Sequence, residues 1–244
     1  MTLRLSHQIA KLGRSRRNGK NEDFSAYLVT SAQPDSPAAE SYRVLRTNLL
    51  YGFMDDPPKT IVLTSPGAGE GKSITCANLG VVLAQAGKNT LVVDCDVRRP
   101  AMHKIFGLHN AKGLIDVLGE EWALHKAWQE PLENLKVIPV GLMPFNPTEL
   151  LGSGRFAEFL KRVRGEFDYV LMDSSPVRLV SDPLILASQV DGVLLVFDAQ
   201  DTRKGAVRQS IRSLEAIGAN VLGTVMNDIK GPERAYYRHS YTYK

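Results

Sequence analysis

Short apolar runs rich in β-branched residues alternate along this chain with longer stretches in which apolar residues recur at helical spacing. The runs predict six strands, and the stretches between them predict helices that cover the strands. This alternation is typical of an α/β fold with a mostly parallel central sheet and helices on both faces. The six runs are residues 60–64, 88–94, 135–140, 169–173, 192–197 and 221–226.

One domain accounts for all of the predicted elements. The first amphipathic helix covers residues 38–53, and Ser36 precedes it as a predicted N-cap. Residues 1–37 carry a basic cluster and end in a segment rich in helix breakers, while residues 231–244 lack core-forming aliphatic side chains. We therefore expect a flexible basic N-terminal arm, a single domain over residues 38–230 and a flexible C-terminal tail.

A glycine-rich stretch joins the first predicted strand to its helix. Residues 65–73 read Ser-Pro-Gly-Ala-Gly-Glu-Gly-Lys-Ser. Backbone N–H groups of such a loop can turn toward phosphate oxygens, Lys72 can neutralise the β- and γ-phosphates, and the Ser73 hydroxyl can ligate Mg²⁺. An ordinary turn would not need a Lys-Ser pair at the helix start, so we predict a phosphate-binding loop, although Pro66 stands where the general pattern has glycine. The predicted nucleotide contacts are Gly67, Ala68, Gly69, Glu70, Gly71, Lys72, Ser73 and Ile74.

Acidic residues follow two further predicted strands. Asp94 and Asp96 end the second strand, and Asp173 lies at the tip of the fourth. Open α/β sheets bind ligands at the carboxyl ends of their strands. Alternation along an extended chain points Asp94 and Asp96 to the same side. We predict that Lys72, Asp94, Asp96 and Asp173 are catalytic and that Ser73, Asp96 and Asp173 hold Mg²⁺. Either Asp94 or Asp96 could accept a proton from an attacking hydroxyl.

Two further patterns concern association and substrate. Glu40, Arg43 and Arg46 recur at a spacing of three on the helix over residues 38–53. That ridge is either a solvated, locally paired surface or a charge-complementary contact with another subunit, and we favour the contact. The C-terminal segment could be an edge strand or a flexible tail that serves as substrate, and we favour the tail. Its four tyrosines are Tyr236, Tyr237, Tyr241 and Tyr243.

Composition narrows the class of protein. A chain of 244 residues with 43% apolar content can bury a sizeable core. The net charge of +4 comes largely from the N-terminal cluster, which we interpret as a solvated arm, so no nucleic-acid partner is expected. No apolar run approaches the roughly 18 residues of a membrane span, and no signal-peptide core is present. We expect a cytoplasmic protein, and the start at Met1 favours a free-standing chain.

Taken in order, these motifs resemble the bacterial tyrosine kinases (BY-kinases) of capsule and exopolysaccharide systems, from about Pro37 to the C-terminus. The motifs are Glu40-x-x-Arg43-x-x-Arg46, the phosphate loop, Asp94-x-Asp96-x-Arg98, Asp173-x-x-Pro176 and the terminal tyrosines. The resemblance implies an ATP- and Mg²⁺-dependent protein-tyrosine kinase that autophosphorylates in trans on its tail and regulates polysaccharide polymerisation and export.

The resemblance also implies partners and finer roles. The partners are further copies of the chain in a ring-like homo-oligomer, a membrane-embedded polysaccharide co-polymerase that activates the kinase and recruits it to the inner face of the plasma membrane, and a cognate tyrosine phosphatase. It favours Asp94 as the base, and by analogy with related folds Asn227 contacts adenine. Ile74 and Val177 differ from the residues usual in this family. These differences affect the expected affinity for the nucleotide more than the resemblance to the family.

Two other hypotheses stay open. One is a partition or division-site positioning ATPase that acts as a dimerising switch. Such loops carry an extra lysine five residues before the main one, where this chain has Gly67. The other is an ATP-binding regulatory scaffold without kinase activity, and the intact Lys72, Asp94 and Asp173 count against it.

Overall fold

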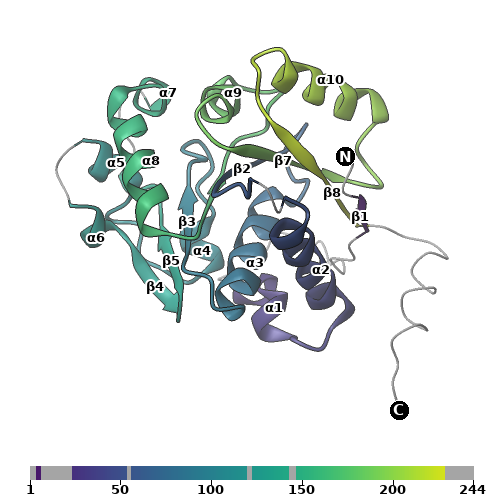
Figure 1. Cartoon of the computed structure of the whole chain (residues 1–244), viewed down its shortest axis with the longest axis horizontal. Coiled ribbons are helices and arrows are strands. Elements are labelled where there is room, and N and C mark those ends of the chain that lie inside the picture. Colours follow the sequence, from purple (N-terminus) through teal and green to yellow (C-terminus); the bar gives the residue numbers. More distant parts are fainter. Residues whose placement is uncertain (1–3, 7–23, 54–55, 120–122, 143–146, 229–244) are drawn as a thin grey trace, which may run out of the picture.

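A single twisted sheet with helices on both faces forms the centre of the molecule (Figure 1). The computed structural model describes residues 4–6, 24–53, 56–119, 123–142 and 147–228. Its described strands follow the order β1-β8-β7-β2-β6-β3-β5-β4, and all neighbouring pairs except β4–β5 are parallel. The predicted fold class is therefore confirmed. The strands are β1 (Arg4–Ser6), β2 (Thr60–Thr64), β3 (Thr90–Asp94), β4 (Gln129–Leu132), β5 (Leu135–Ile138), β6 (Tyr169–Asp173), β7 (Gly192–Asp198) and β8 (Val221–Asn227).

The helices lie where the apolar spacing predicted them, with short additions. Ser36 caps α2 as expected, since its Oγ accepts a hydrogen bond from the Ala39 N–H at 3.1 Å. In the described chain, no helix combines the length and the apolar character needed to cross a membrane. The helices are η1 (Phe24–Tyr27), α1 (Val29–Ala32), α2 (Pro37–Tyr51), α3 (Lys72–Gln85), α4 (Met102–Ile105), α5 (Leu114–Leu118), α6 (Leu124–Ala127), α7 (Pro147–Leu151), α8 (Gly154–Glu166), α9 (Asp182–Ala187) and α10 (Lys204–Glu215).

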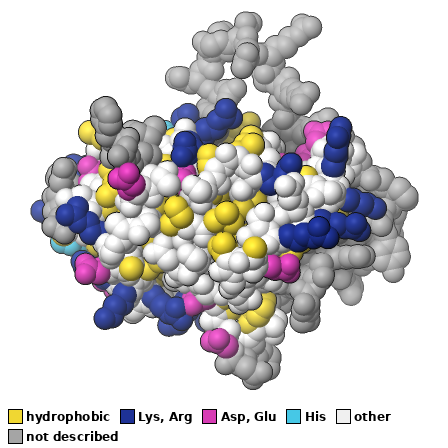
Figure 2. Space-filling view, turned by 90° about the horizontal axis from the view of Figure 1, so that it is seen from above, with side chains coloured by type: hydrophobic (Ala, Val, Ile, Leu, Met, Phe, Trp, Pro, Cys, Tyr) yellow, Lys and Arg dark blue, Asp and Glu magenta, His cyan; other side chains and the backbone are white. Residues whose placement is uncertain are grey.

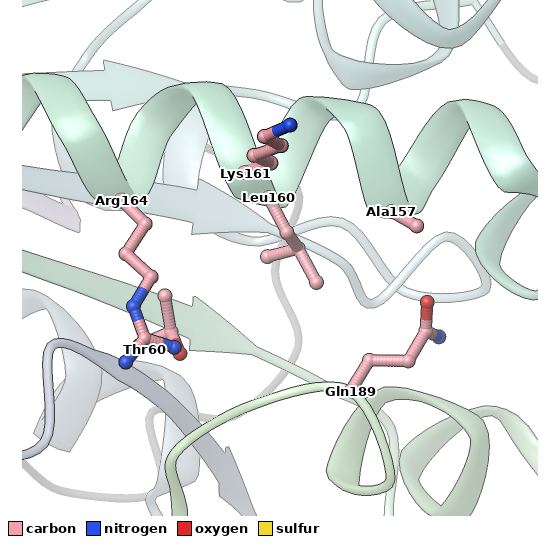
Figure 3. A pocket seen from close by; sticks show the side chains of 6 residues that line it. All are labelled: Thr60, Ala157, Leu160, Lys161, Arg164 and Gln189. Atoms are coloured by element: carbon pink, nitrogen blue, oxygen red, sulfur yellow. The ribbon is translucent and has the colours of Figure 1, made fainter.

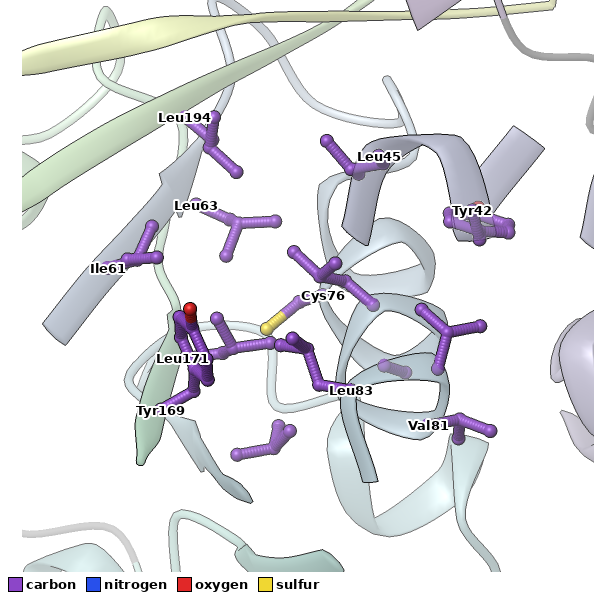
Figure 4. Close-up of a cluster of buried hydrophobic side chains, with 14 of the residues drawn as sticks. Tyr42, Leu45, Ile61, Leu63, Cys76, Val81, Leu83, Tyr169, Leu171 and Leu194 are labelled. Atoms are coloured by element: carbon purple, nitrogen blue, oxygen red, sulfur yellow. The ribbon is translucent and has the colours of Figure 1, made fainter. Parts of the chain in front are cut away.

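Alternate residues of the central strands point into separate apolar layers. On β2, Ile61 and Leu63 pack with α2 and α3, and Figure 4 shows Leu45 of α2 and Cys76 of α3 in this layer. Val62 points the other way, into a layer that includes Phe156 of α8. Because both faces of the strands are buried, the sheet holds its strand tips in fixed positions, and these tips carry the predicted chemistry.

The N-terminal segment differs from the expectation of a flexible arm over residues 1–37. Residues 24–36 include η1 and α1, with Thr30 buried against α3. The Thr30 N–H and hydroxyl both donate to Asn78 Oδ1, at 3.1 and 2.9 Å. Asn78 is buried in α3, and a buried amide needs such partners. The prediction is therefore wrong for this segment, and also for β1, which pairs in parallel with β8.

Charges of both signs are exposed on the surface. Figure 2 shows apolar side chains mainly in the middle of one face, with Lys and Arg side chains mostly around its rim and acidic ones between them. The predicted tyrosine tail, residues 231–244, lies outside the described residues. Both cysteines, Cys76 and Cys95, are buried and free.

Candidate nucleotide-binding and catalytic site

The predicted phosphate loop lies at the centre of the sheet, between the end of β2 and the start of α3. Gly69 and Gly71 have positive φ angles of 80° and 88°, a conformation that glycine adopts without strain. A Cβ atom on Gly71 would lie 2.3 Å from Nδ2 of Asn227. The loop therefore needs glycine at position 71 for two reasons, its backbone angle and the close approach of a neighbouring side chain.

Strand register brings the predicted acidic residues beside this loop. Leu63 of β2 is paired with Asp173 of β6, and Asp173 is paired with Asp94 of β3. Neighbouring strand tips thus present Asp173 and Asp94 next to the loop, as the sequence predicted for parallel strands. Asp96 follows two residues beyond the end of β3.

Lys72 lies between two of these carboxylates. Its Nζ is 2.8 Å from Asp96 Oδ2, 3.4 Å from Asp173 Oδ1 and 3.0 Å from Ser73 Oγ. Burial lowers the pKa of Lys72, but the nearby charges of Asp173 and Asp96 raise it by more, so the net shift is upward and the ammonium stays charged. The Lys72 ammonium therefore lies against Ser73, Asp96 and Asp173, the residues predicted to bind Mg²⁺.

Asp94 has different partners from Asp96. Its Oδ2 accepts hydrogen bonds from the N–H groups of Ala101 and Met102, both at 2.9 Å, and its Oδ1 accepts from the Asp96 N–H at 3.2 Å. Burial and the charge of Asp173 raise the pKa of Asp94 to about 7 against the opposing effect of these donors. Asp94 thus holds the turn after β3. Because β3 ends at Asp94, strand alternation does not extend to Asp96.

Ser175 is a site residue that the prediction missed. Its hydroxyl donates to Asp96 Oδ1 at 2.8 Å, and the same oxygen accepts from the Arg99 N–H at 3.1 Å. Asp96 therefore has partners at both oxygens. The hydroxyl pair after Asp173 was visible in the sequence, but only the packing of β6 beside β3 shows which acid it contacts.

Asn227, at the end of β8, and Thr202, which follows β7, both contact Glu70 of the phosphate loop. Asn227 Nδ2 donates to the Glu70 carbonyl at 2.8 Å and to Thr75 Oγ1 at 3.4 Å. Glu70 Oε1 accepts from the Thr202 hydroxyl at 2.9 Å, and burial raises the pKa of this carboxyl. Asn227 was predicted to contact adenine, and its described side-chain contacts are with the loop and the first turn of α3.

The donor set fits a magnesium ion bound together with a nucleotide. Oδ2 of Asp173 is buried without a hydrogen-bond partner, and a buried oxygen of this kind suits a cation or its water shell. The part of the chain that the structure describes has no cluster of three or more His, Cys, Asp or Glu side chains arranged for a metal. Mg²⁺ commonly uses one or two carboxylates with waters and phosphate oxygens, so Ser73, Asp96 and Asp173 suffice.

The predicted assembly ridge on α2 divides into an exposed part and an inward part. Glu40 Oε2 and Arg43 Nη1 form an ion pair at 2.8 Å with side chains 60% and 31% exposed. Arg43 also donates to the Pro34 carbonyl. Arg46 instead donates from Nη1 to the Val82 carbonyl of α3 at 3.2 Å. Within one subunit, therefore, Glu40 and Arg43 pair with each other at the surface, while Arg46 contacts α3.

A separate pocket opens near the amino-terminal end of β2 (Figure 3). Its volume is about 390 Å³, and Arg164, one of its lining residues, forms an ion pair with Asp191 at 2.5 Å. No predicted site residue lines this pocket, since the phosphate loop follows the opposite end of β2. Its lining residues are Thr60, Ala157, Leu160, Lys161, Arg164 and Gln189.

Comparison with known proteins gives consistent matches. Residues 58–222 match a family described as an AAA domain. The chain is 34% identical to the tyrosine-protein kinase YwqD of Bacillus subtilis over 222 residues, which is 91% of this chain and 94% of that protein. It is 37% identical to EpsB of Ralstonia nicotianae over 88% of this chain, and it spans only 28% of that protein's length.

Comparison with solved structures leads to the same family. The kinase domain of the Escherichia coli tyrosine kinase ETK superposes with a TM-score of 0.81 at 28% identity, covering 96% of this chain and 89% of that one. Since the order of motifs, the geometry around the phosphate loop and these matches coincide, the chain belongs to the bacterial tyrosine-protein kinase family.

Proposed function

We propose that this chain transfers the γ-phosphoryl group of MgATP to tyrosine hydroxyl groups, and that its main substrate is the tail of another copy of the chain. The proposal rests on the position of Lys72, which ends the phosphate loop next to Ser73 and lies within hydrogen-bond distance of Asp96 and Asp173. This arrangement supplies the cation and the carboxylates that phosphoryl transfer requires. The proposed acceptors are Tyr236, Tyr237, Tyr241 and Tyr243.

In this mechanism the protein contributes positioning and charge. The N–H groups of residues 67–74 would hold the phosphate oxygens, and Lys72 would exchange a carboxylate contact for them. Ser73, Asp96 and Asp173 would hold Mg²⁺, which supplies neutralisation of the growing negative charge.

Asp94, the last residue of β3, or Asp96 would accept the proton from the tyrosine Oη. The raised pKa of Asp94, about 7, suits a base that works near neutral pH. Asp94 accepts two main-chain hydrogen bonds at Oδ2 and one at Oδ1, so the proton would go to the remaining lone pair of Oδ1.

Asn227 would select the base of the nucleotide. Its Oδ1 atom is buried and unpartnered, while Nδ2 is occupied by the loop. A lone acceptor favours the exocyclic amine of adenine over the carbonyl oxygen at the same position of guanine. We expect ATP to be preferred to GTP, with the preference reduced in Asn227→Asp because the retained acceptor loses its fixed orientation.

The proposed setting follows the family. Copies would form a ring-like homo-oligomer through the exposed ridge of Glu40 and Arg43 on α2. A membrane-embedded polysaccharide co-polymerase would activate the kinase and recruit it from the cytoplasm to the inner face of the plasma membrane, and a tyrosine phosphatase would reverse the modification. Tail phosphorylation adds roughly −1.5 to −2 charge per site, which would repel the tail from the acidic site and loosen the ring. The cycle would thereby regulate polymerisation and export.

The experiment is incubation of the purified chain with MgATP, followed by phosphotyrosine detection and measurement of released phosphate. The proposal predicts labelled tail tyrosines. Phosphate release without labelling would instead identify a switch ATPase, and MgATP binding with neither product would identify a scaffold. Lys72→Met serves as the control for contaminating kinases.

A further inference from the structure

Helix α2 is attached to the last turn of α3, the helix that begins with Lys72. Arg46 Nη1 donates to the Val82 carbonyl at 3.2 Å. In a continuing helix that carbonyl would accept from Ala86, but the Ala86 N–H donates to Leu83 instead. Arg46 therefore supplies the missing donor, and its positive charge lies at the negative end of the helix dipole.

The first turn of α3 has a second attachment to α2. Tyr42 is fully buried, one turn before Arg46, and its hydroxyl lies next to the Thr75 side chain. Figure 4 shows Tyr42 beside α3. Thr75 Oγ1 also accepts from Asn227, whose Nδ2 binds the Glu70 carbonyl of the phosphate loop at 2.8 Å. A contact of Tyr42 with Thr75, and the hydrogen bonds of Asn227 with Thr75 and Glu70, therefore link α2 to the loop.

We propose that Tyr42 and Arg46 are positioning residues for the phosphate loop, and that by fixing both ends of α3 against α2 they set its affinity for the phosphates of MgATP. The inference rests on the nucleotide site of the proposed function and does not require transfer to tyrosine. Arg46 and Arg43 therefore have different roles, because Arg43 pairs on the surface with Glu40 while Arg46 contacts α3.

The arrangement also predicts coupling between assembly and nucleotide binding. The exposed ridge and the buried contacts belong to the same helix, so a partner that shifts α2 also shifts the first turn of α3. Because such linkage is reciprocal, MgATP should change subunit affinity by the same factor by which assembly changes MgATP affinity.

The test measures MgATP binding and thermal unfolding of the full chain in Arg46→Met, Arg46→Lys and Tyr42→Phe. Arg162→Met is the matched control, since Arg162 forms an exposed ion pair with Glu166 on α8. We expect Kd for MgATP to rise about fivefold in Arg46→Met, as for the loss of one hydrogen bond, with partial recovery in Arg46→Lys. Tyr42→Phe removes only the hydroxyl and keeps the packed aromatic side chain. The variant should therefore bind MgATP more weakly, while the ligand-free protein unfolds near the wild-type temperature.

A purely structural role would lower the melting temperature equally with and without MgATP, whereas positioning reduces the increment that MgATP produces. Wild-type Kd and a wild-type increment in both Arg46→Met and Tyr42→Phe would overturn the inference, as would equal weakening in Arg162→Met. A wild-type chain that binds MgATP but labels no tyrosine would overturn the proposed kinase function and leave this comparison intact.

Discussion

Replacing Lys72 by Met is expected to destabilise the ligand-free protein as well as to abolish catalysis. The Lys72 side chain is 11% exposed, and the side chains of its partners Asp96 and Asp173 are 3% and 0% exposed. Methionine cannot neutralise them, and it leaves buried carboxylates beside one another. Removing one partner of a buried ion pair costs about 3–5 kcal/mol. For a domain of this size, a loss of about 3 kcal/mol lowers Tm by about 6–12 °C.

The assay is denaturant unfolding of Lys72→Met without nucleotide or Mg²⁺, followed by circular dichroism. The matched control is the double variant Lys72→Met/Asp96→Asn, which removes one negative charge together with the positive one and should recover part of the loss. An unfolding free energy of Lys72→Met within about 0.5 kcal/mol of wild type, the range of ordinary surface substitutions, would refute the buried pairing of Lys72.

The other predictions concern assembly, pH and the loop. Arg43→Glu should give smaller species by light scattering with MgATP binding retained, and an unchanged size would mean that the ridge is only solvated. Burial raises the pKa of Asp191, but hydrogen bonds from Thr60 and Lys59 and the charge of Arg164 lower it by more. This carboxylate therefore contributes stability above its unfolded pKa of about 4, which is lost as pH falls through the lower folded value. Asp191→Asn should accordingly be less stable at pH 7, with a deficit that shrinks below about pH 4; a deficit independent of pH would contradict this. Gly71→Ala should abolish MgATP binding in calorimetry, because its Cβ meets Asn227, whereas Gly69→Ala, with no atom within 4 Å, should cost only about 1 kcal/mol of backbone strain; equal effects would contradict the close approach.

Local patterns sufficed for the central elements of the fold. Apolar runs predicted the buried strands, and Ser36 marked the start of α2. The edge strand β4 was missed because Gln129–Leu132 contains Pro131 and alternates between half-buried and exposed residues, a weak signal confined to sheet edges. The packing of residues 24–36 was missed because it depends on Asn78, which is 48 residues from Thr30.

The candidate site was predictable by residue type but not by partner. Strand tips and the glycine-rich loop identified Lys72, Asp94 and Asp173, since parallel strands end at a common edge. The sequence could not show that Asp94 is held by main-chain N–H groups or that Arg46 turns inward, because both depend on tertiary packing.

A mixing experiment shows whether the phosphoryl group passes from one copy of the chain to another. An inactive chain with an intact tail, Lys72→Met/Asp96→Asn, is combined with an active chain whose four tail tyrosines are replaced by Phe, and MgATP is added. Transfer between copies requires phosphotyrosine on the inactive chain at Tyr236, Tyr237, Tyr241 or Tyr243, located by mass spectrometry. An unlabelled inactive chain, in a mixture where both chains are folded and co-assembled and the active chain binds nucleotide, would contradict it.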